Sequence, residues 1–163
     1  MIALTALLFV VAGGIGAYAL GGYLGEGIPG ERWIPAEEAS TRVAELGADI
    51  PLPAGRDFTW RADNLRNLPG VVQEAGVIET LAHDAACMWA HEWVQAQTDR
   101  DLGRASRAYE TILAARDWPY WTVINAEFYD DELLELANNM EDGSTERVKS
   151  DLQLHCADYT HSQ

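Results

Sequence analysis

Apolar residues recur with the spacing of an α-helix along much of the chain, and the longest such pattern covers residues 71–97. One stripe of this predicted helix is apolar, which is typical of a buried face. It contains Val71, Ile78, Ala82, Ala85, Trp89, Trp93 and Ala96. A second stripe lies roughly opposite and consists of Glu79, His83, Cys87 and His91, each four positions after the last. We therefore expect this helix to have neighbours on two sides, as the central helix of a bundle does.

Shorter patterns of the same kind predict further helices. Pro35 and the acidic residues after it open a helix that reaches Leu46 and is ended by Gly47. Residues 61–68 predict one or two turns, and residues 102–116 predict an amphipathic helix. Thr98 is the expected N-cap before that helix, with Asp101 three residues later.

The C-terminal third continues the helical pattern. Residues 120–140 fit one helix or two, although residues 122–124 also fit a short strand. Ser144 is the expected cap of a last helix, whose apolar stripe extends to Tyr159. Residues 48–57 contain two prolines and favour extended structure. The fold class predicted from these patterns is all-α: an N-terminal transmembrane helix followed by a small extracytoplasmic bundle of four to five helices.

The N-terminal segment contains no charged residue between residues 2 and 24. A helix of this length spans about 35 Å, which exceeds the ~30 Å hydrocarbon core of a bilayer. We expect residues 1–24 to be a membrane anchor, residues 25–35 a Gly/Pro linker, residues 36–160 a helical domain and residues 161–163 a frayed tail. A cleaved signal peptide is the main alternative, with secretion after cleavage near Ala19. The third interpretation is that this segment forms a buried helix of a soluble protein.

Small residues recur at every fourth position within this segment, at Gly13, Ala17, Gly21 and Gly25. Such a ridge lets a second helix approach closely in a membrane. The plainer interpretation is that glycine and alanine are common in membrane segments and signal peptides. The ridge is therefore compatible with a helix–helix contact to a membrane-protein partner, and the plainer interpretation needs no such contact.

The charge of the chain is strongly negative, with 26 acidic and 11 basic residues and a net charge of −15. The first charged side chain is Glu26, so the whole charge lies after the apolar segment. Such a surface repels phosphate backbones, which argues against nucleic-acid binding. With 163 residues, the chain has room for one domain. We place this domain outside the cytoplasm, at the cell membrane.

The two cysteines, Cys87 and Cys156, are predicted to lie on different helices. In an oxidising compartment they would form a disulfide, closing a loop of about 70 residues. Two buried free thiols are one alternative. A metal site formed by His83, Cys87 and His91 is another, although a ridge that also includes Glu79 is too long for four ligands to converge on one ion.

Recognisable catalytic or cofactor motifs are missing from the sequence, so we assign no catalytic residue and expect no cofactor. Nine acidic residues and no basic one lie between Asp117 and Glu146, which favours a solvated face or a docking surface for a basic partner. Four tryptophans sit at helical spacing, at Trp89, Trp93, Trp118 and Trp121. They fit core packing, or else an exposed platform for a ligand.

The favoured function is a non-catalytic interaction or accessory subunit of a membrane assembly. The alternatives are a metal-binding or enzymatic domain centred on His83, Cys87 and His91, and a protein that binds a ligand through its tryptophans.

Overall fold

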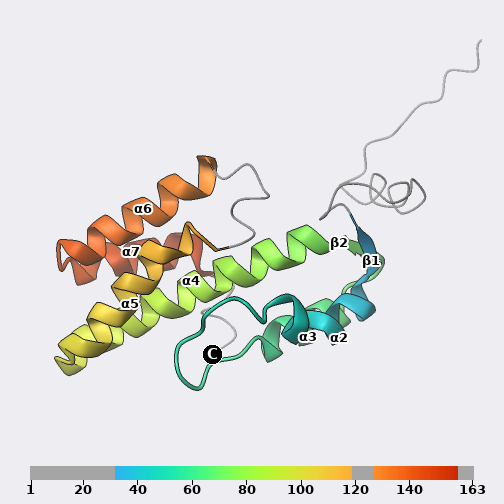
Figure 1. Ribbon diagram of the computed structural model, residues 1–163, viewed down its shortest axis with the longest axis horizontal. Helices are drawn as coiled ribbons and strands as arrows, with labels where there is room; N and C mark the ends of the chain where they lie inside the picture. The colour runs from blue at the N-terminus through green and yellow to red at the C-terminus, as the bar shows by residue number, and fades with distance from the viewer. Residues whose placement is uncertain (1–31, 119–126, 158–163) are drawn as a thin grey trace, which may run out of the picture.

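The computed structural model describes residues 32–118 and 127–157. Within these ranges the chain is mostly helical, which confirms the all-α prediction, and a two-stranded antiparallel sheet accompanies the helices (Figure 1). The elements are β1 (Trp33–Pro35), α2 (Ala36–Leu46), α3 (Thr59–Arg66), β2 (Val71–Gln73), α4 (Glu74–Asp99), α5 (Leu102–Ala115), α6 (Glu127–Glu141) and α7 (Thr145–His155).

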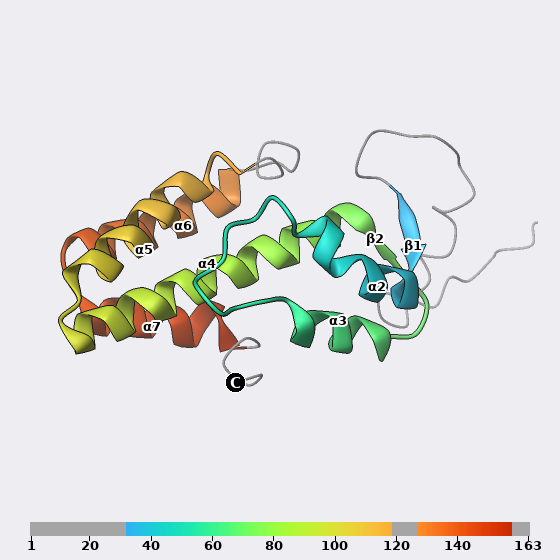
Figure 2. The ribbon, with the colours of Figure 1, turned by 60° about the horizontal axis from the view of Figure 1, so that its bottom comes forward.

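Helix α4 is the central element of the fold. Its 26 residues span about 39 Å, and the other elements form two groups along it (Figures 1 and 2). The strand pair, α2 and α3 lie along its N-terminal part, whereas α5, α6 and α7 surround its C-terminal part. One continuous apolar core joins the two groups through α4. The prediction of a central helix with neighbours on two sides is therefore confirmed.

Helices α4 and α5 form an antiparallel hairpin. Many of their buried residues are alanines, including Ala90, Ala96 and Ala108, so the two backbones can approach closely. The connection consists of Arg100, in the left-handed conformation with φ 60°, and Asp101. Asp101 Oδ1 accepts a hydrogen bond of 3.0 Å from the backbone N–H of Arg104 and so caps α5. The prediction of Thr98 as the cap is wrong, because α4 continues through Asp99.

The beginning of α4 also differs from the prediction. Val71 does not belong to the buried helical stripe, because it is exposed and lies in β2. Gly70 precedes it with φ 93°, and β2 then pairs with β1 so that Val72 lies opposite the fully buried Ile34. The peptide N–H of Glu74, the first helical residue, donates to the carbonyl of Arg32. Residues 33–35, placed in the linker by the sequence, thus form a strand.

The α2–α3 connection begins and continues with turns, at residues 47–50 and 54–55, and it lies against α4. Gly47 ends α2 as predicted, and a Cβ atom at this position would lie 2.6 Å from Cε2 of Phe58. The indole N–H of Trp89 donates a 2.9 Å hydrogen bond to the carbonyl of Pro51. These two contacts hold residues 47–58 against the start of α3 and the middle of α4.

Several predictions concern residues outside the described ranges. These are the anchor over residues 1–24, its ridge of Gly13, Ala17, Gly21 and Gly25, the alternative strand at residues 122–124, and the tail at residues 161–163. Among the described residues, no helix is both long enough and apolar enough to cross a membrane.

Candidate functional site

The disulfide predicted between Cys87 and Cys156 is present. It joins the middle of α4 to the residue directly after α7, with the two Cα atoms 5.7 Å apart. The two cysteines are 69 positions apart in the sequence, so the bond closes a long loop of the chain. It therefore ties the last described helix to the central one.

The alternative metal site is not formed. Cys87 is oxidised, so its sulfur is not available as a thiolate ligand. No group of three His, Cys, Asp or Glu side chains in residues 32–118 and 127–157 is arranged to hold a metal ion. His91 is not at the disulfide pocket and is partly buried nearer to Arg56, and burial, assisted by that guanidinium, lowers its pKa.

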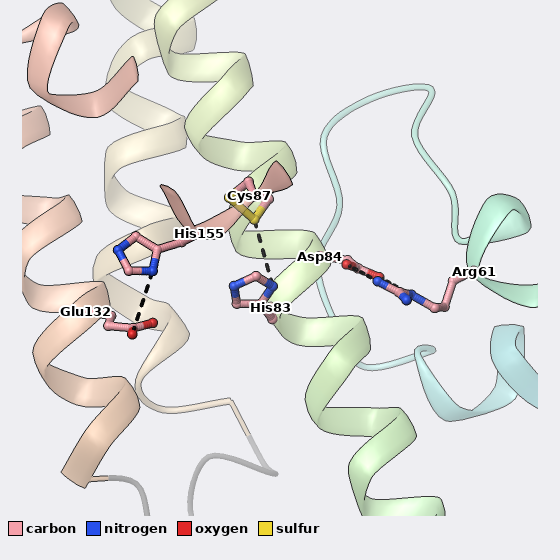
Figure 3. The surroundings of a disulfide bond; sticks show 7 residues. Arg61, His83, Asp84, Cys87, Glu132 and His155 are labelled. Carbon is pink, nitrogen blue, oxygen red and sulfur yellow. Dashed lines mark hydrogen bonds and ion pairs between the residues drawn. A yellow bond between two sulfur atoms is a disulfide. The ribbon is translucent and has the colours of Figure 1, made fainter. Parts of the chain in front are cut away.

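A small pocket of about 50 Å³ opens beside the disulfide, between α4, α6 and α7. Both cysteines contribute to its wall, together with apolar side chains such as Leu136 and Leu152. His83 and His155 add two imidazoles and Glu132 adds a carboxylate (Figure 3). The structure thus brings His83, one of the residues singled out in the sequence, together with His155 and with Glu132, which the sequence did not assign to this site.

Two distances describe the polar side of this pocket. His83 Nδ1 lies 3.9 Å from Cys87 Sγ, one helical turn further along α4. His155 Nδ1 lies 3.7 Å from a carboxylate oxygen of Glu132, which links α7 to α6 (Figure 3). Because both partners of this second pair are partly exposed, water screens it and it contributes little to stability.

Helix α7 packs against both α4 and α6 and is also tied to α4 by the disulfide. Val148 and Leu152 are its buried residues. The amide of Asn139 on α6 donates a 2.9 Å hydrogen bond to Asp151. The helix has 11 residues, and isolated helices shorter than about 12–15 residues are marginal in water. Its position therefore depends on this packing together with the bond at Cys156.

A buried ion pair lies on the other side of α4 from the pocket. Arg61 of α3 donates two hydrogen bonds, both 2.8 Å, to the two carboxylate oxygens of Asp84 (Figure 3). Asp84 is 2% exposed and Arg61 is 17% exposed, and the guanidinium also lies 4.1 Å from the centroid of the Trp60 ring. Sequence reasoning missed this pair, although an acid within an apolar stretch of helix was a signal that a cation must lie nearby.

A second hollow lies between α5 and α6, with a volume of about 240 Å³. Leu113 and Leu134 line it and are 40% and 51% exposed. Arg116 and Asp131 are its charged residues. We call this hollow the α5–α6 groove.

The tryptophans within the described residues do not form an exposed platform. Trp93 and Trp118 are buried in the core, while Trp33, Trp60 and Trp89 are partly buried. The core-packing interpretation is confirmed for Trp93 and Trp118, and Trp121 lies outside the described ranges.

Comparisons with known proteins found no matching family model, no matching curated protein and no matching solved structure.

Proposed function

We propose that the chain is a non-catalytic accessory domain, held at a membrane by residues 2–24, which binds a protein partner outside the cytoplasm. The uncharged N-terminal stretch supports the anchor, because it is long enough to span a bilayer. The Cys87–Cys156 disulfide supports a location outside the cytoplasm, because such bonds persist in oxidising compartments.

The observation that carries this proposal is the α5–α6 groove. Leu113 and Leu134 leave a large part of their apolar surface in water on opposite sides of one hollow. Single exposed leucines are common on protein surfaces, but two that line the same concave surface offer a place for an apolar side chain. A partner that fills the groove would remove both leucines from water.

The charge of the segment that contains α6 indicates the kind of partner, while the groove wall itself carries one basic residue, Arg116, and one acidic residue, Asp131. The segment from Asp117 to Glu146, which includes α6, carries nine acidic residues and no basic one. A segment of a partner protein with apolar residues on one face and Lys or Arg beside them would complement this surface. We therefore propose a basic amphipathic segment of a membrane-associated protein as the occupant.

The test is co-purification of the full-length protein from its native membranes in a mild detergent. The proposal predicts that a partner elutes with the protein and is lost from the double variant Leu113→Glu/Leu134→Glu. Leu102→Glu is the matched control, because Leu102 is 75% exposed on the first turn of α5 and does not line the groove. Recovery of the protein alone, or retention of the partner by the double variant, would contradict the proposal.

A further inference from the structure

We infer that the pocket between α4, α6 and α7 is a thiol–disulfide exchange site, at which a dithiol reductant opens the Cys87–Cys156 bond and releases α7. This inference does not depend on the partner proposed for the α5–α6 groove. It rests on access to the sulfurs, on the group beside Cys87 and on how α7 is held.

Access to the bond comes from the pocket. Both cysteines line it, and their exposed fractions differ, at 2% for Cys87 and 7% for Cys156. Cys156 also lies at the end of α7, whereas Cys87 lies in the middle of the central helix. Cys156 Sγ is therefore the sulfur that an incoming thiolate attacks.

The group beside Cys87 favours its departure. His83 Nδ1 lies 3.9 Å from Cys87 Sγ, so a protonated imidazole at this position stabilises the thiolate that forms there. A thiol that is more acidic leaves faster in disulfide exchange. The arrangement therefore makes Cys87 the leaving group and Cys156 the site of attack.

The exchange proceeds in two balanced steps. One thiolate of the dithiol attacks Cys156 Sγ, the Cys87–Cys156 bond breaks, and Cys87 leaves as a thiolate beside His83. The second thiol of the reductant, once deprotonated, then attacks the mixed disulfide and releases Cys156 as a thiolate. The reductant departs as a cyclic disulfide, and the protein has gained two electrons and, after protonation of the two thiolates, two protons.

Reduction changes the fold locally because it removes the covalent link that supplements the packing of α7 against α4 and α6. Val148 and Leu152 are the buried side chains of α7, and its 11 residues are too few for a stable isolated helix. Most of the core lies on α4, α5, α6 and the α2–α3 group. Release of α7 uncovers the apolar wall of the pocket, which includes Ala86 and Leu136.

The test treats the full-length protein in detergent with dithiothreitol, without denaturant. Intact mass follows reduction as a gain of ~2 Da, and hydrogen exchange is measured on peptides from α4, α5 and α7. We expect reduction under native conditions, with a loss of protection that is greatest in α7. Reduction that occurs only in denaturant, or unchanged protection of α7 after reduction, would overturn the inference.

A pair of variants tests the part played by His83. His83→Gln is expected to slow reduction about threefold, because the leaving thiolate loses its cationic neighbour. Glu79→Gln is the matched control, because Glu79 lies one turn earlier on the same helix and outside the pocket wall. Equal rates for wild type and His83→Gln would contradict the inference.

The pH profile separates a charge effect from a packing effect. A charge effect makes the ratio of wild-type to His83→Gln rates depend on pH, whereas a packing effect leaves the ratio constant. The other titratable groups lining this pocket, on α6 and α7, are Glu132, Glu135, Asp151 and His155. They are present in both proteins, so the ratio isolates His83, and a ratio that does not change with pH would overturn its assignment.

The double variant Cys87→Ser/Cys156→Ser provides a test that does not depend on reaction rates. It should show the same loss of protection in α7 as the reduced wild type, and this loss should exceed the loss in α4 and α5 that follows from lower global stability. Full protection of α7 in this variant would show that the disulfide does not hold the helix and would overturn the proposed release.

Discussion

Arg61 and Asp84 form a bidentate ion pair that fixes α3 against the middle of α4, and both of its hydrogen bonds are 2.8 Å long. The two residues are 23 positions apart, and Asp84 is almost completely buried. A buried carboxylate is tolerated because the guanidinium compensates for its lost hydration. The pair thus sets the position of the α2–α3 group along the central helix.

Removing only one partner of this pair should be strongly destabilising. We expect Arg61→Leu to lower the free energy of unfolding by about 3 kcal/mol, because it leaves the Asp84 carboxylate buried without its partner. The double variant Arg61→Leu/Asp84→Leu should recover most of that loss, because it removes both charges. Urea unfolding of wild type, both single variants and the double variant measures this, and additive losses would contradict the account.

Two glycines should respond in opposite directions to the same substitution. At Gly47 an added Cβ would lie 2.6 Å from the ring of Phe58, so Gly47→Ala should destabilise by about 1–3 kcal/mol. At Gly76, within α4, an added Cβ would lie 4.0 Å from Cβ of Gln73, so Gly76→Ala should stabilise by up to about 1 kcal/mol. Thermal unfolding measures both effects. Melting temperatures that shift in the same direction for the two variants would contradict this description of the turn after α2.

Loss of the disulfide should weaken the whole domain. The chain-entropy model gives about 4 kcal/mol for a loop of this length, which is a large part of the typical 5–15 kcal/mol for a domain. We expect Cys87→Ser/Cys156→Ser to lose about this amount in urea unfolding. A loss below about 1 kcal/mol would show that the bond contributes little to the stability of the folded domain.

His91 should make part of the stability depend on pH. Burial, assisted by Arg56, lowers its pKa, so the unfolded chain binds a proton at a higher pH than the folded domain does. Stability from this group is therefore complete above the imidazole pKa of the unfolded chain, which is about 6.5. This contribution to stability falls as the pH drops below that value toward the lowered pKa of His91 in the folded domain.

The measurement compares wild type with His91→Gln, because the many carboxylates of the chain also titrate at acidic pH. The free energy of unfolding of the wild type should decrease more than that of the variant when the pH is lowered from neutral to mildly acidic. Parallel decreases in the two proteins would mean that His91 contributes no pH dependence.

Most helices could be predicted because their signals are local. The periodic pattern of α4, the glycine after α2 and the apolar stripe before Cys156 depend on residues within a few turns of one another. The disulfide also followed, since the chain contains two cysteines and both lie on apolar-flanked faces. The helical character of the domain and its central helix thus emerge from the sequence.

The missed features depend on contacts between distant segments. Residues 71–73 fit a helical stripe, but pairing with residues 33–35 makes them a strand. The pocket brings His83 and His155 together only because the disulfide places the end of α7 beside α4. The Arg61–Asp84 pair likewise depends on how α3 docks onto α4, which periodicity does not determine.

Photo-cross-linking from the α5–α6 groove tests the proposed function most directly. A photoreactive phenylalanine analogue replaces Leu134 in the full-length, membrane-bound protein, and the same analogue replaces Leu102 in the control. The account predicts one defined adduct with a membrane-associated protein from position 134, with a basic amphipathic segment at the cross-link, and no such adduct from position 102. Absence of an adduct at position 134, or the same adducts from both positions, would contradict the proposal that this groove binds a partner.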